Sequence, residues 1–276
     1  MNEPLLLDQH PLSPYAQKVR ILLREKGLDF ESRTPEGLGS GAANADFAQR
    51  NPRFEVPALT HNGATIFDST IILEYLEECF PLPPMMPGGA AAKARMRMIE
   101  EVCDTHYEAI NWGLGEIRFF RRGDAALRQK LYAAAVEQVG QMHAWLETLL
   151  GDEPWLSGAS FGWGDLCALP YVIMSRMFGI PPAAGSRLEA WLERGMNRPS
   201  VAQTVAEALA VIPVMETRVQ SVQSGSFKRH YRDHRLEWMI RSGGLQVVLD
   251  GLASDNIRFT DLARFAAWKG EPSTRR

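Results

Sequence analysis

Two serine residues, Ser13 and Ser69, stand where the sequence predicts that a helix begins. Ser13 is followed by Pro14 and Ser69 is preceded by Asp68, residue types that are favoured at helix N-caps and in the first helical turn. A helix N-terminus presents free N–H groups and the positive end of the helix dipole, which attract a carboxylate. On these residues alone, Ser13 is predicted to cap a helix. Asp68 and Ser69 can cap a helix and can also bind a carboxylate.

The three cysteines, Cys79, Cys103 and Cys167, show no paired spacing and no C-x-x-C motif. They therefore predict neither a disulfide framework nor dithiol chemistry, and their sparse use fits a reducing compartment. Each lies in an apolar helical context, so we interpret all three as buried structural thiols. The six histidines lack metal-ligand spacing, and we expect no metal.

The charge balance limits the kinds of partner. A net charge of −3 and a pI near 6.1 give no reason to expect nucleic acid or an anionic membrane as a partner. The N-terminus has no basic region of the kind that opens a signal peptide. The longest apolar stretch, about residues 166–174, is far shorter than the roughly 20 residues that a membrane span needs. We therefore expect a cytoplasmic protein with no membrane partner.

The first 80 residues show a mixed pattern of short strands and helices. Apolar side chains at Tyr15, Val19 and Leu22 recur with helical spacing, and Gly27 follows at the position where a helix often ends. Asn-Gly within residues 61–63 is a strong hairpin signal. The predicted order is β-α-β-α-β-β-α, which is typical of a thioredoxin-like domain, with elements at residues 4–8, 14–26, 29–33, 46–50, on each side of 61–63, and at 69–80.

The sequence after residue 80 predicts helices only. A proline- and glycine-rich linker spans residues 81–89. Helical patterns follow at residues 93–121, 127–150, 164–178, 188–194 and 201–210. The fold class is therefore an α/β thioredoxin-like N-terminal domain plus an all-α C-terminal domain. The predicted divisions are a thioredoxin-like domain (1–80), the linker (81–89), a helical domain (90–213) and a C-terminal extension (214–276).

The extension contains a basic stretch, KRHYRDHR. Residues 228–241 hold five Lys and Arg side chains, but Asp233 and Glu237 partly offset them and no array of stacking aromatics is present. We interpret the stretch as a solvated helix face rather than a nucleic-acid site. The apolar run Leu245–Leu249 indicates that the extension packs back onto the rest of the chain.

Three segments resemble the cytosolic glutathione S-transferases. LLLDQHPLSPYAQKVRILLREKGLDFE resembles their opening strand and helix, and NPRFEVPALTHNGATIFDSTIILEYLEECFP resembles the rest of their glutathione domain. WLSGASFGWGDLCAL resembles the start of the central helix of their second domain. The segments occur in the family's order and spacing, and the resemblance covers about residues 4–210. The extension after about residue 214 is longer than in typical members, so the family pattern does not explain it.

The resemblance implies a glutathione site. Val56 and Pro57 are joined by a cis peptide, and the backbone of Val56 pairs with the cysteinyl backbone of glutathione. Ser69 receives the γ-glutamyl carboxylate, and Asp68, where many members carry Glu or Gln, helps to hold the γ-glutamyl amine. Ser13 lies where Ser-type transferases, such as the plant tau class, place the hydroxyl that donates a hydrogen bond to the glutathione sulfur. The thiolate is the nucleophile, since a free thiol has a pKa of about 8.5.

The same resemblance implies an acceptor pocket between the domains, above Ser13. Tyr107 and Trp112 are candidate wall residues, and the alternative is that they only pack the domain interface. Leu12 is a candidate for the floor. His10 lies in the same loop as Ser13, and a loop histidine most often has no catalytic role. Members with cysteine at position 13 carry out thiol–disulfide exchange, so serine here indicates that this chain does not.

Residues 161–166, Phe-Gly-Trp-Gly-Asp-Leu, resemble a folding motif of the family. Most members have Ser or Thr where this chain has Gly162. Asp165 can still bond back to the backbone of the cap, and Phe161 and Leu166 can form a hydrophobic staple across the helix start. We expect Asp165 to be buried and structural.

The functional expectation is a glutathione transferase that activates the glutathione thiolate for attack on a small hydrophobic electrophile. Glutathione is the cosubstrate, and a homodimer is implied. Ether cleavage and dehalogenation use the same thiolate. The alternative is a glutathione-binding or protein-interaction module of the same fold with little turnover. A peroxidase or an isomerase would differ from these only in its acceptor pocket. The extension is expected to cover either the acceptor site or the dimer edge.

Overall fold

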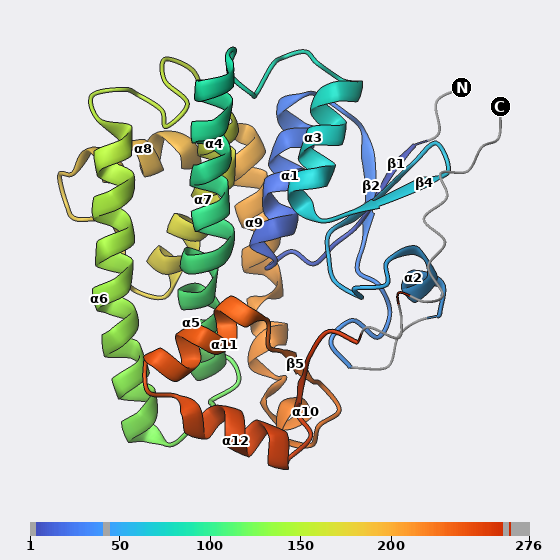
Figure 1. The fold of residues 1–276 in the computed structure, drawn as a ribbon, viewed down its shortest axis with the longest axis vertical. Helices are drawn as coiled ribbons and strands as arrows, with labels where there is room; N and C mark the ends of the chain where they lie inside the picture. The colour runs from blue at the N-terminus through green and yellow to red at the C-terminus, as the bar shows by residue number, and fades with distance from the viewer. Residues whose placement is uncertain (1–3, 41–44, 262–264, 266–276) are drawn as a thin grey trace.

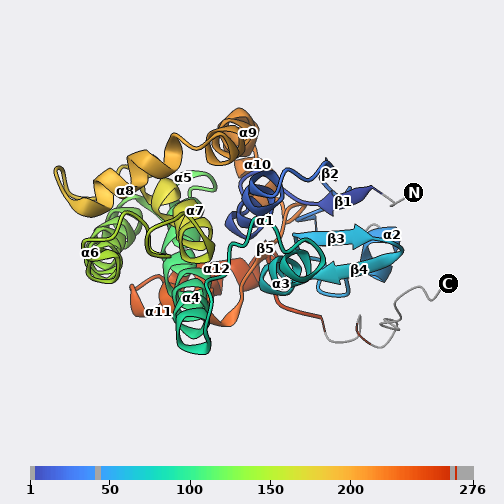
Figure 2. The ribbon, with the colours of Figure 1, turned by 90° about the horizontal axis from the view of Figure 1, so that it is seen from above.

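The computed structural model describes residues 4–40, 45–261 and 265 of the chain. The strands of the first 80 residues lie at one side of the molecule, and the later helices lie at the other (Figures 1 and 2). Two helices, α1 and α3, stand between the sheet and the helical domain (Figure 2). Their bounds, with those of the other elements of this part, are β1 Leu5–Asp8, α1 Pro14–Glu25, β2 Phe30–Arg33, α2 Ala45–Arg50, β3 Ala58–His61, β4 Ala64–Phe67 and α3 Ser69–Cys79.

The predicted element order of the first domain is confirmed. The sheet has the order β2-β1-β3-β4, in which β1 pairs with β2 in parallel and with β3 antiparallel. Asn62 and Gly63 join β3 to β4 with φ values of 49° and 76°. Two positive φ values in succession define the turn that the Asn-Gly pair predicts. The mixed α/β domain followed by helices confirms the predicted fold class.

The helical domain is built around one buried helix. Nearly every residue of α7 is buried, in agreement with its mostly apolar sequence. A turn of π-helix joins α4 to α5, so the single long helix predicted at residues 93–121 is interrupted. α9 runs on past residue 213, where the sequence predicts the extension to begin. The elements are α4 Ala90–Val102, the π-helical turn Cys103–Tyr107, α5 Glu108–Arg118, α6 Ala125–Leu150, α7 Trp163–Met177, α8 Arg187–Met196 and α9 Pro199–Glu216.

Asp165 fixes the start of α7. It is fully buried, and its carboxylate accepts hydrogen bonds from the backbone N–H groups of Leu156, Ser157 and Gly162 at 2.7–3.2 Å. The indole N–H of Trp191 donates to it at 2.8 Å. The prediction that Asp165 is buried and structural is confirmed. A Cβ at Gly162 would lie 2.7 Å from the carbonyl oxygen of Met85, so the close approach of the linker excludes a larger cap residue.

The C-terminal extension packs across the helical domain toward the sheet. Its elements are α10 Val219–Gln223, β5 Arg229–His230, α11 Asp233–Arg241, α12 Leu245–Ala253 and β6 Ile257–Arg258. In Figure 1, α11 and α12 cross the lower ends of the long helices. The ring of Trp238 in α11 packs directly on Gly113 of α5. The predicted packing of the extension onto the rest of the chain is therefore confirmed.

The basic stretch of the extension is not a solvated helix face, and that prediction is wrong. Residues 228–232 precede α11, and His230 and Tyr231 are 8% and 2% exposed. The physical reason is that buried glutamates from distant parts of the chain neutralise the basic groups. Arg229 pairs with Glu116 and Arg235 pairs with Glu108.

One cysteine also departs from the prediction. Cys103 and Cys167 are buried, as the sequence predicts, but Cys79 is exposed. It ends α3, and this last turn lies at the surface together with the exposed Glu78. The apolar stripe of α3 is therefore in the core at Ile72 and Leu76 but not at its end.

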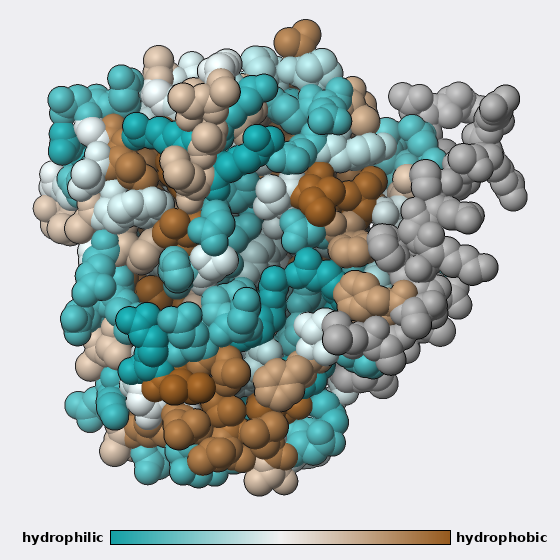
Figure 3. Space-filling view, viewed as in Figure 1, coloured by the Kyte–Doolittle hydropathy of each residue, from teal (hydrophilic) through white to brown (hydrophobic). Residues whose placement is uncertain are grey.

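The surface carries an apolar patch at the end of the molecule formed by the extension. Figure 3 shows it as the brown area over α12, at the bottom of the view. The large apolar side chains exposed on α11 and α12 are Ile240, Leu245, Leu249 and Leu252. Among the described residues, no helix is both long enough and apolar enough to cross a membrane.

Candidate active site

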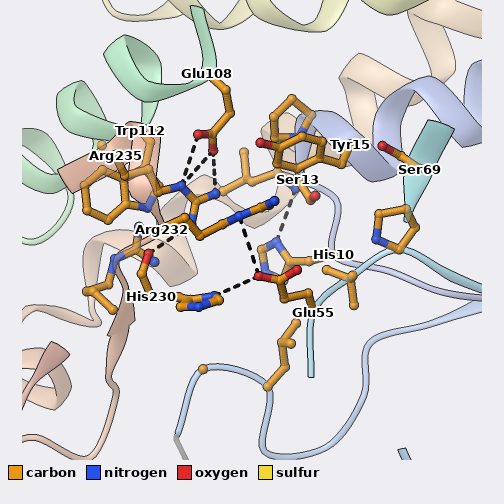
Figure 4. A pocket seen from close by; sticks show the side chains of 18 of the residues that line it. His10, Ser13, Tyr15, Glu55, Ser69, Glu108, Trp112, His230, Arg232 and Arg235 are labelled. Atoms are coloured by element: carbon orange, nitrogen blue, oxygen red, sulfur yellow. Dashed lines mark hydrogen bonds and ion pairs between the residues drawn. The ribbon is translucent and has the colours of Figure 1, made fainter. Parts of the chain in front are cut away.

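A large cavity of about 880 Å³ lies between the sheet domain and the helical domain. Its walls come from many parts of the chain. They include the loops after β1 and β2, the start of α3 with the loop before β3, helices α4 to α5, parts of α7 and α9, and the C-terminal extension. Figure 4 shows this convergence, with Ser13 and Ser69 on one side and Glu108, Trp112 and the extension on the other. Most of the residues that the sequence marks as functional face this one space.

Ser13 both caps α1 and faces the cavity. Its Oγ accepts a hydrogen bond from the backbone N–H of Ala16 at 3.3 Å, and Pro14 occupies the first helical position. This bond occupies a lone pair of the oxygen and leaves the hydroxyl proton free to donate. Ser13 also lines the cavity. The two interpretations of Ser13 in the sequence therefore do not exclude each other.

The backbone of Val56 is open to a ligand. The Val56–Pro57 peptide is cis, as the family resemblance implies. The pairing of β3 with β1 begins only at Ala58, and among the described residues the amide and carbonyl of Val56 have no backbone partner. Both Val56 and Pro57 line the cavity. An extended peptide can therefore pair with this backbone edge.

Asp68 and Ser69 form the start of α3 at the cavity wall. Asp68 is the N-cap, and its Oδ1 accepts from the backbone N–H of Thr70 at 3.1 Å. Its φ of 78° lies in a region that costs a non-glycine residue about 1–3 kcal/mol. Arg53 donates to its other oxygen at 3.1 Å. Ser69 is the first helical residue and lines the cavity, so the positive end of α3 faces the cavity there.

A buried ion cluster beneath this site joins the two domains. Lys18 of α1 is fully buried, and its Nζ lies 2.5 Å from Glu100 of α4 and 2.5 Å from Asp104 of the π-helical turn. The hydroxyl of Tyr171 donates to Asp104, and Thr70 donates to Glu100. Burial raises the pKa of Asp104, whereas Lys18 outweighs burial at Glu100 and lowers its pKa. The cluster holds α1, which carries Ser13 at its start, against the helical domain.

This cluster is not among the features predicted from the sequence. Two acidic residues four positions apart, Glu100 and Asp104, share one face of a helix and are the signal that was available. Nothing local to Lys18 indicates that it is buried, because its partners lie more than 80 positions away.

Of the three residues predicted for the acceptor pocket, two line the cavity and one does not. Leu12 and Trp112 line the cavity, and Tyr107 does not, so the placement of Tyr107 is corrected. Tyr107 is fully buried, and its hydroxyl contacts His143 Nε2 at 2.7 Å and Ser175 Oγ at 2.8 Å. Side chains five positions apart point to different faces of a helix, so only one of Tyr107 and Trp112 can face the cavity.

His10 lines the cavity beside Ser13. Its Nδ1 accepts from the backbone N–H of Leu12 at 3.3 Å, which places its ring proton on Nε2. Burial lowers the pKa of His10 to about 4, and the charges of Arg20, Arg229 and Arg218 add to this effect. His10 is therefore neutral near pH 7 and can act there only as an uncharged donor or contact.

The extension supplies cavity residues that the sequence analysis did not predict. The Nδ1 of His230 lies 2.9 Å from Glu55, and the guanidinium of Arg235 lies 2.5 Å from Glu108 (Figure 4). Burial alone would raise the pKa of Glu108, but Arg235 and His234 lower it to about 2. Burial likewise opposes ionisation of Glu55, yet His230, Arg232 and Arg53 hold its pKa far below the usual range. Both glutamates are therefore ionised anchors for the extension.

Among the described residues, no group of three His, Cys, Asp or Glu side chains is arranged to hold a metal ion. The cavity instead offers a hydroxyl, a helix N-terminus, an open backbone edge and basic side chains. These groups suit an anionic peptide-like ligand.

Comparison with known proteins identifies relatives of both domains. Residues 12–79 match the family model for the glutathione S-transferase N-terminal domain, and residues 129–194 match that for the C-terminal domain. The maleylacetoacetate isomerase of Pseudomonas aeruginosa is 29% identical over 196 residues, covering 69% of this chain and 91% of the relative. Glutathione S-transferase U19 of Arabidopsis thaliana is 28% identical over 215 residues, covering 75% of this chain and 91% of the relative.

A solved structure extends this likeness. The crystal structure of a glutathione S-transferase from Methylobacterium radiotolerans, in complex with glutathione sulfonate, is 31% identical to this chain with a TM-score of 0.61. The match covers 74% of this chain and 95% of that one.

Proposed function

Because the chain belongs to the glutathione S-transferase family, we propose that Ser13 activates the glutathione thiol in this transferase. The single observation that carries the proposal is the geometry of Ser13, whose oxygen accepts the cap bond while its proton stays free at the cavity. Lowering a thiol pKa by two units stabilises the thiolate by about 2.7 kcal/mol. One hydrogen bond to a charged group contributes about 1.5–3 kcal/mol, and a helix N-terminus about 0.3–1 kcal/mol. These two contributions are sufficient.

Glutathione is proposed to lie along the sheet-domain side of the cavity. The open backbone of Val56, before Pro57, pairs with the cysteinyl residue. The start of α3 at Ser69 receives the γ-glutamyl carboxylate, and Asp68 helps to hold the γ-glutamyl amine. The M. radiotolerans relative, solved with glutathione sulfonate, supports a ligand of this kind.

The electrophile is proposed to enter from the helical side, where Leu12 and Trp112 line the cavity. The thiolate attacks an electrophilic carbon, so that a C–S bond forms. Either a leaving group departs with its electron pair, or an activated alkene accepts a proton. The apolar rings along this wall favour a small hydrophobic acceptor. We also propose that the protein is a cytoplasmic homodimer, as the family resemblance implies, and sedimentation equilibrium tests the dimer.

The alternative is a glutathione-binding or protein-interaction module with little turnover. One observation favours it, namely that Ser13 has a complete structural role as the cap of α1. A pair of variants separates the two functions. Ser13→Gly removes the hydroxyl, yet Gly is tolerated at N-caps and costs only a few tenths of a kcal/mol there. Ser13→Thr keeps both the hydroxyl and the cap.

The test measures turnover of 1-chloro-2,4-dinitrobenzene and calorimetric affinity for glutathione in parallel. The enzyme account predicts that Ser13→Gly loses roughly a hundredfold in kcat/KM but keeps most of its glutathione affinity, whereas Ser13→Thr keeps activity. Binding of glutathione with no acceleration of conjugation in the unmodified protein would favour the binding module instead.

A further inference from the structure

The segment from residue 227 to residue 235 lines the cavity and is held in place by contacts on both sides. On the sheet-domain side, the backbone N–H of Lys228 donates to the carbonyl of Gly39 at 2.7 Å, and Phe227 packs against the same glycine. On the helical side, Arg235 pairs with Glu108. The side chains of this segment therefore have fixed positions in the cavity.

Most of the basic groups in this segment make short ion pairs, whereas Arg232 makes only a long one. Arg229 lies 2.5 Å from Glu116, and Arg235 lies 2.5 Å from Glu108. The nearest carboxylate oxygen to Arg232 belongs to Glu55, at 3.9 Å from its Nε, which is too far for a hydrogen bond. Within the described part of the chain, the terminal nitrogens of Arg232 make no hydrogen bond and no closer ion pair.

Both oxygens of Glu55 have closer partners than Arg232. Its Oε1 is 2.9 Å from His230 Nδ1, and its Oε2 accepts from Arg53 at 2.8 Å. A guanidinium carries five N–H donors in a planar fork that matches a carboxylate. The fork of Arg232 thus reaches into the cavity with donors to spare, past its contact with Glu55 (Figure 4).

The position of this fork associates it with the acceptor. Arg232 stacks over the ring of Tyr15 at 5.7 Å, and the hydroxyl of Tyr15 donates to the backbone carbonyl of Asp104 in the helical domain. In Figure 4, Arg232 enters from the side of Trp112 and Glu108, and Ser69 lies beyond Ser13 at the opposite edge. The fork therefore stands beside Tyr15 and Glu55 of the sheet domain, where that domain meets the helical one, and away from the proposed γ-glutamyl site.

Aromatic rings line the helical side of the cavity. They belong to helices α5 and α7, to the residues that follow them, and to the extension: Trp112, Phe119, Phe120, Tyr171, Phe178 and Phe227. A ligand with a flat apolar body can pack on these rings, and one anionic group on that ligand can pair with the fork of Arg232.

We propose that the electrophilic acceptor carries a carboxylate, and that Arg232 of the C-terminal extension binds it. This inference rests on the proposed transferase function and names its substrate class. The carboxylate stays unchanged in the reaction: the glutathione sulfur forms a bond to the electrophilic carbon of the acceptor, and the leaving group departs from that carbon. Arg232 is thus a specificity-determining residue that the extension adds to the family fold.

The experiment compares two acceptors that differ only at this group, 4-chloro-3,5-dinitrobenzoate and its methyl ester. Each enzymatic kcat/KM is divided by the rate constant for spontaneous reaction of the same compound with glutathione, which removes the difference in intrinsic reactivity. In the unmodified protein, the normalised kcat/KM is expected to be about tenfold or more higher for the carboxylate than for the ester. This factor corresponds to the free energy of one charge-assisted hydrogen bond. Arg232→Gln is expected to bring this ratio near one, and Arg232→Lys to give an intermediate ratio.

Arg241→Gln is the matched control. It removes one positive charge from the same extension, but Arg241 is 78% exposed and paired with Glu237 outside the cavity. It is expected to keep the ratio of the unmodified protein. Calorimetric binding of the two preformed glutathione conjugates provides a second readout that needs no turnover, with the same ratios expected.

The proposal is overturned if the unmodified protein and Arg232→Gln show equal ratios in both measurements. It is also overturned if Arg232→Gln raises the KM for glutathione by the same factor with either acceptor and leaves the carboxylate-to-ester ratio unchanged. In that case the fork binds the glycyl carboxylate of glutathione instead of the acceptor. Failure of the transferase function gives a different result: neither acceptor is accelerated, and the conjugate-binding ratio alone decides the role of Arg232.

Discussion

Gly113 of α5 tests how the extension is attached. A Cβ added at Gly113 would lie 2.0 Å from Cζ3 and 2.5 Å from Cε3 of Trp238, far inside van der Waals contact. Trp238 is 6% exposed, so its ring is enclosed by neighbouring groups. Gly113→Ala is therefore expected to push Trp238, and α11 with it, away from α5.

The size of the effect follows from two opposing contributions. Alanine in place of glycine in a helix interior stabilises it by roughly 1 kcal/mol. Overpacking a core costs about 1–3 kcal/mol, and complete loss of a buried tryptophan from its site costs about 3–5 kcal/mol. The net expectation is a loss of up to roughly 4 kcal/mol in the free energy of unfolding.

Gly140→Ala is the matched control, because Gly140 lies inside α6 and a Cβ there would meet nothing within 4 Å. It is expected to gain up to about 1 kcal/mol. Urea unfolding measures both variants, and the ratio of carboxylate to ester turnover reports whether Arg232 has moved with α11. Equal gains in stability for the two variants, with an unchanged acceptor ratio, would refute the described packing of Trp238 on α5.

Two further predictions concern the buried polar groups. Lys18→Met leaves Glu100 and Asp104 buried without their cation. Breaking such a pair is expected to lower the free energy of unfolding, measured with urea, by about 3–5 kcal/mol. A loss below about 1 kcal/mol would show that the cluster does not hold the domains together. Burial lowers the pKa of His143 from 6.5 to about 4, so between these pH values the unfolded chain binds a proton there that the folded chain does not. Stability is therefore expected to fall as the pH drops through this window. His143→Gln should reduce that slope in urea unfolding, and an unchanged slope contradicts the assignment.

The sheet domain could be predicted from the sequence because its signals are local. The helical spacing after Pro14, Gly27 at the end of α1, and Asn62-Gly63 between two short strands each act over a few residues. The cap at Ser13 is of the same kind, since its partner Ala16 lies three positions away. Such features depend on backbone conformations that only a few residue types adopt, so the residue types reveal them.

The cavity wall formed by the extension could not be predicted in this way. The partners of Arg229, His230 and Arg235 are glutamates more than 100 positions away, at Glu116, Glu55 and Glu108. No local pattern distinguishes such neutralised, buried basic groups from solvated ones. The predictions for Tyr107 and Cys79 failed for a related reason. The sequence shows which residues share a helix face. It does not show which other element packs on that face, or at which residue that packing ends.

The central claim is that the hydroxyl of Ser13 stabilises the thiolate of bound glutathione. Its most direct test is an ultraviolet titration of the thiolate of bound glutathione, in the unmodified protein and in Ser13→Gly. We expect a bound pKa well below the value of about 8.5 for a free thiol, and a return toward that value in the variant. A bound pKa that is not lowered, or that is lowered equally in Ser13→Gly, would contradict the claim and leave Ser13 as a helix cap alone.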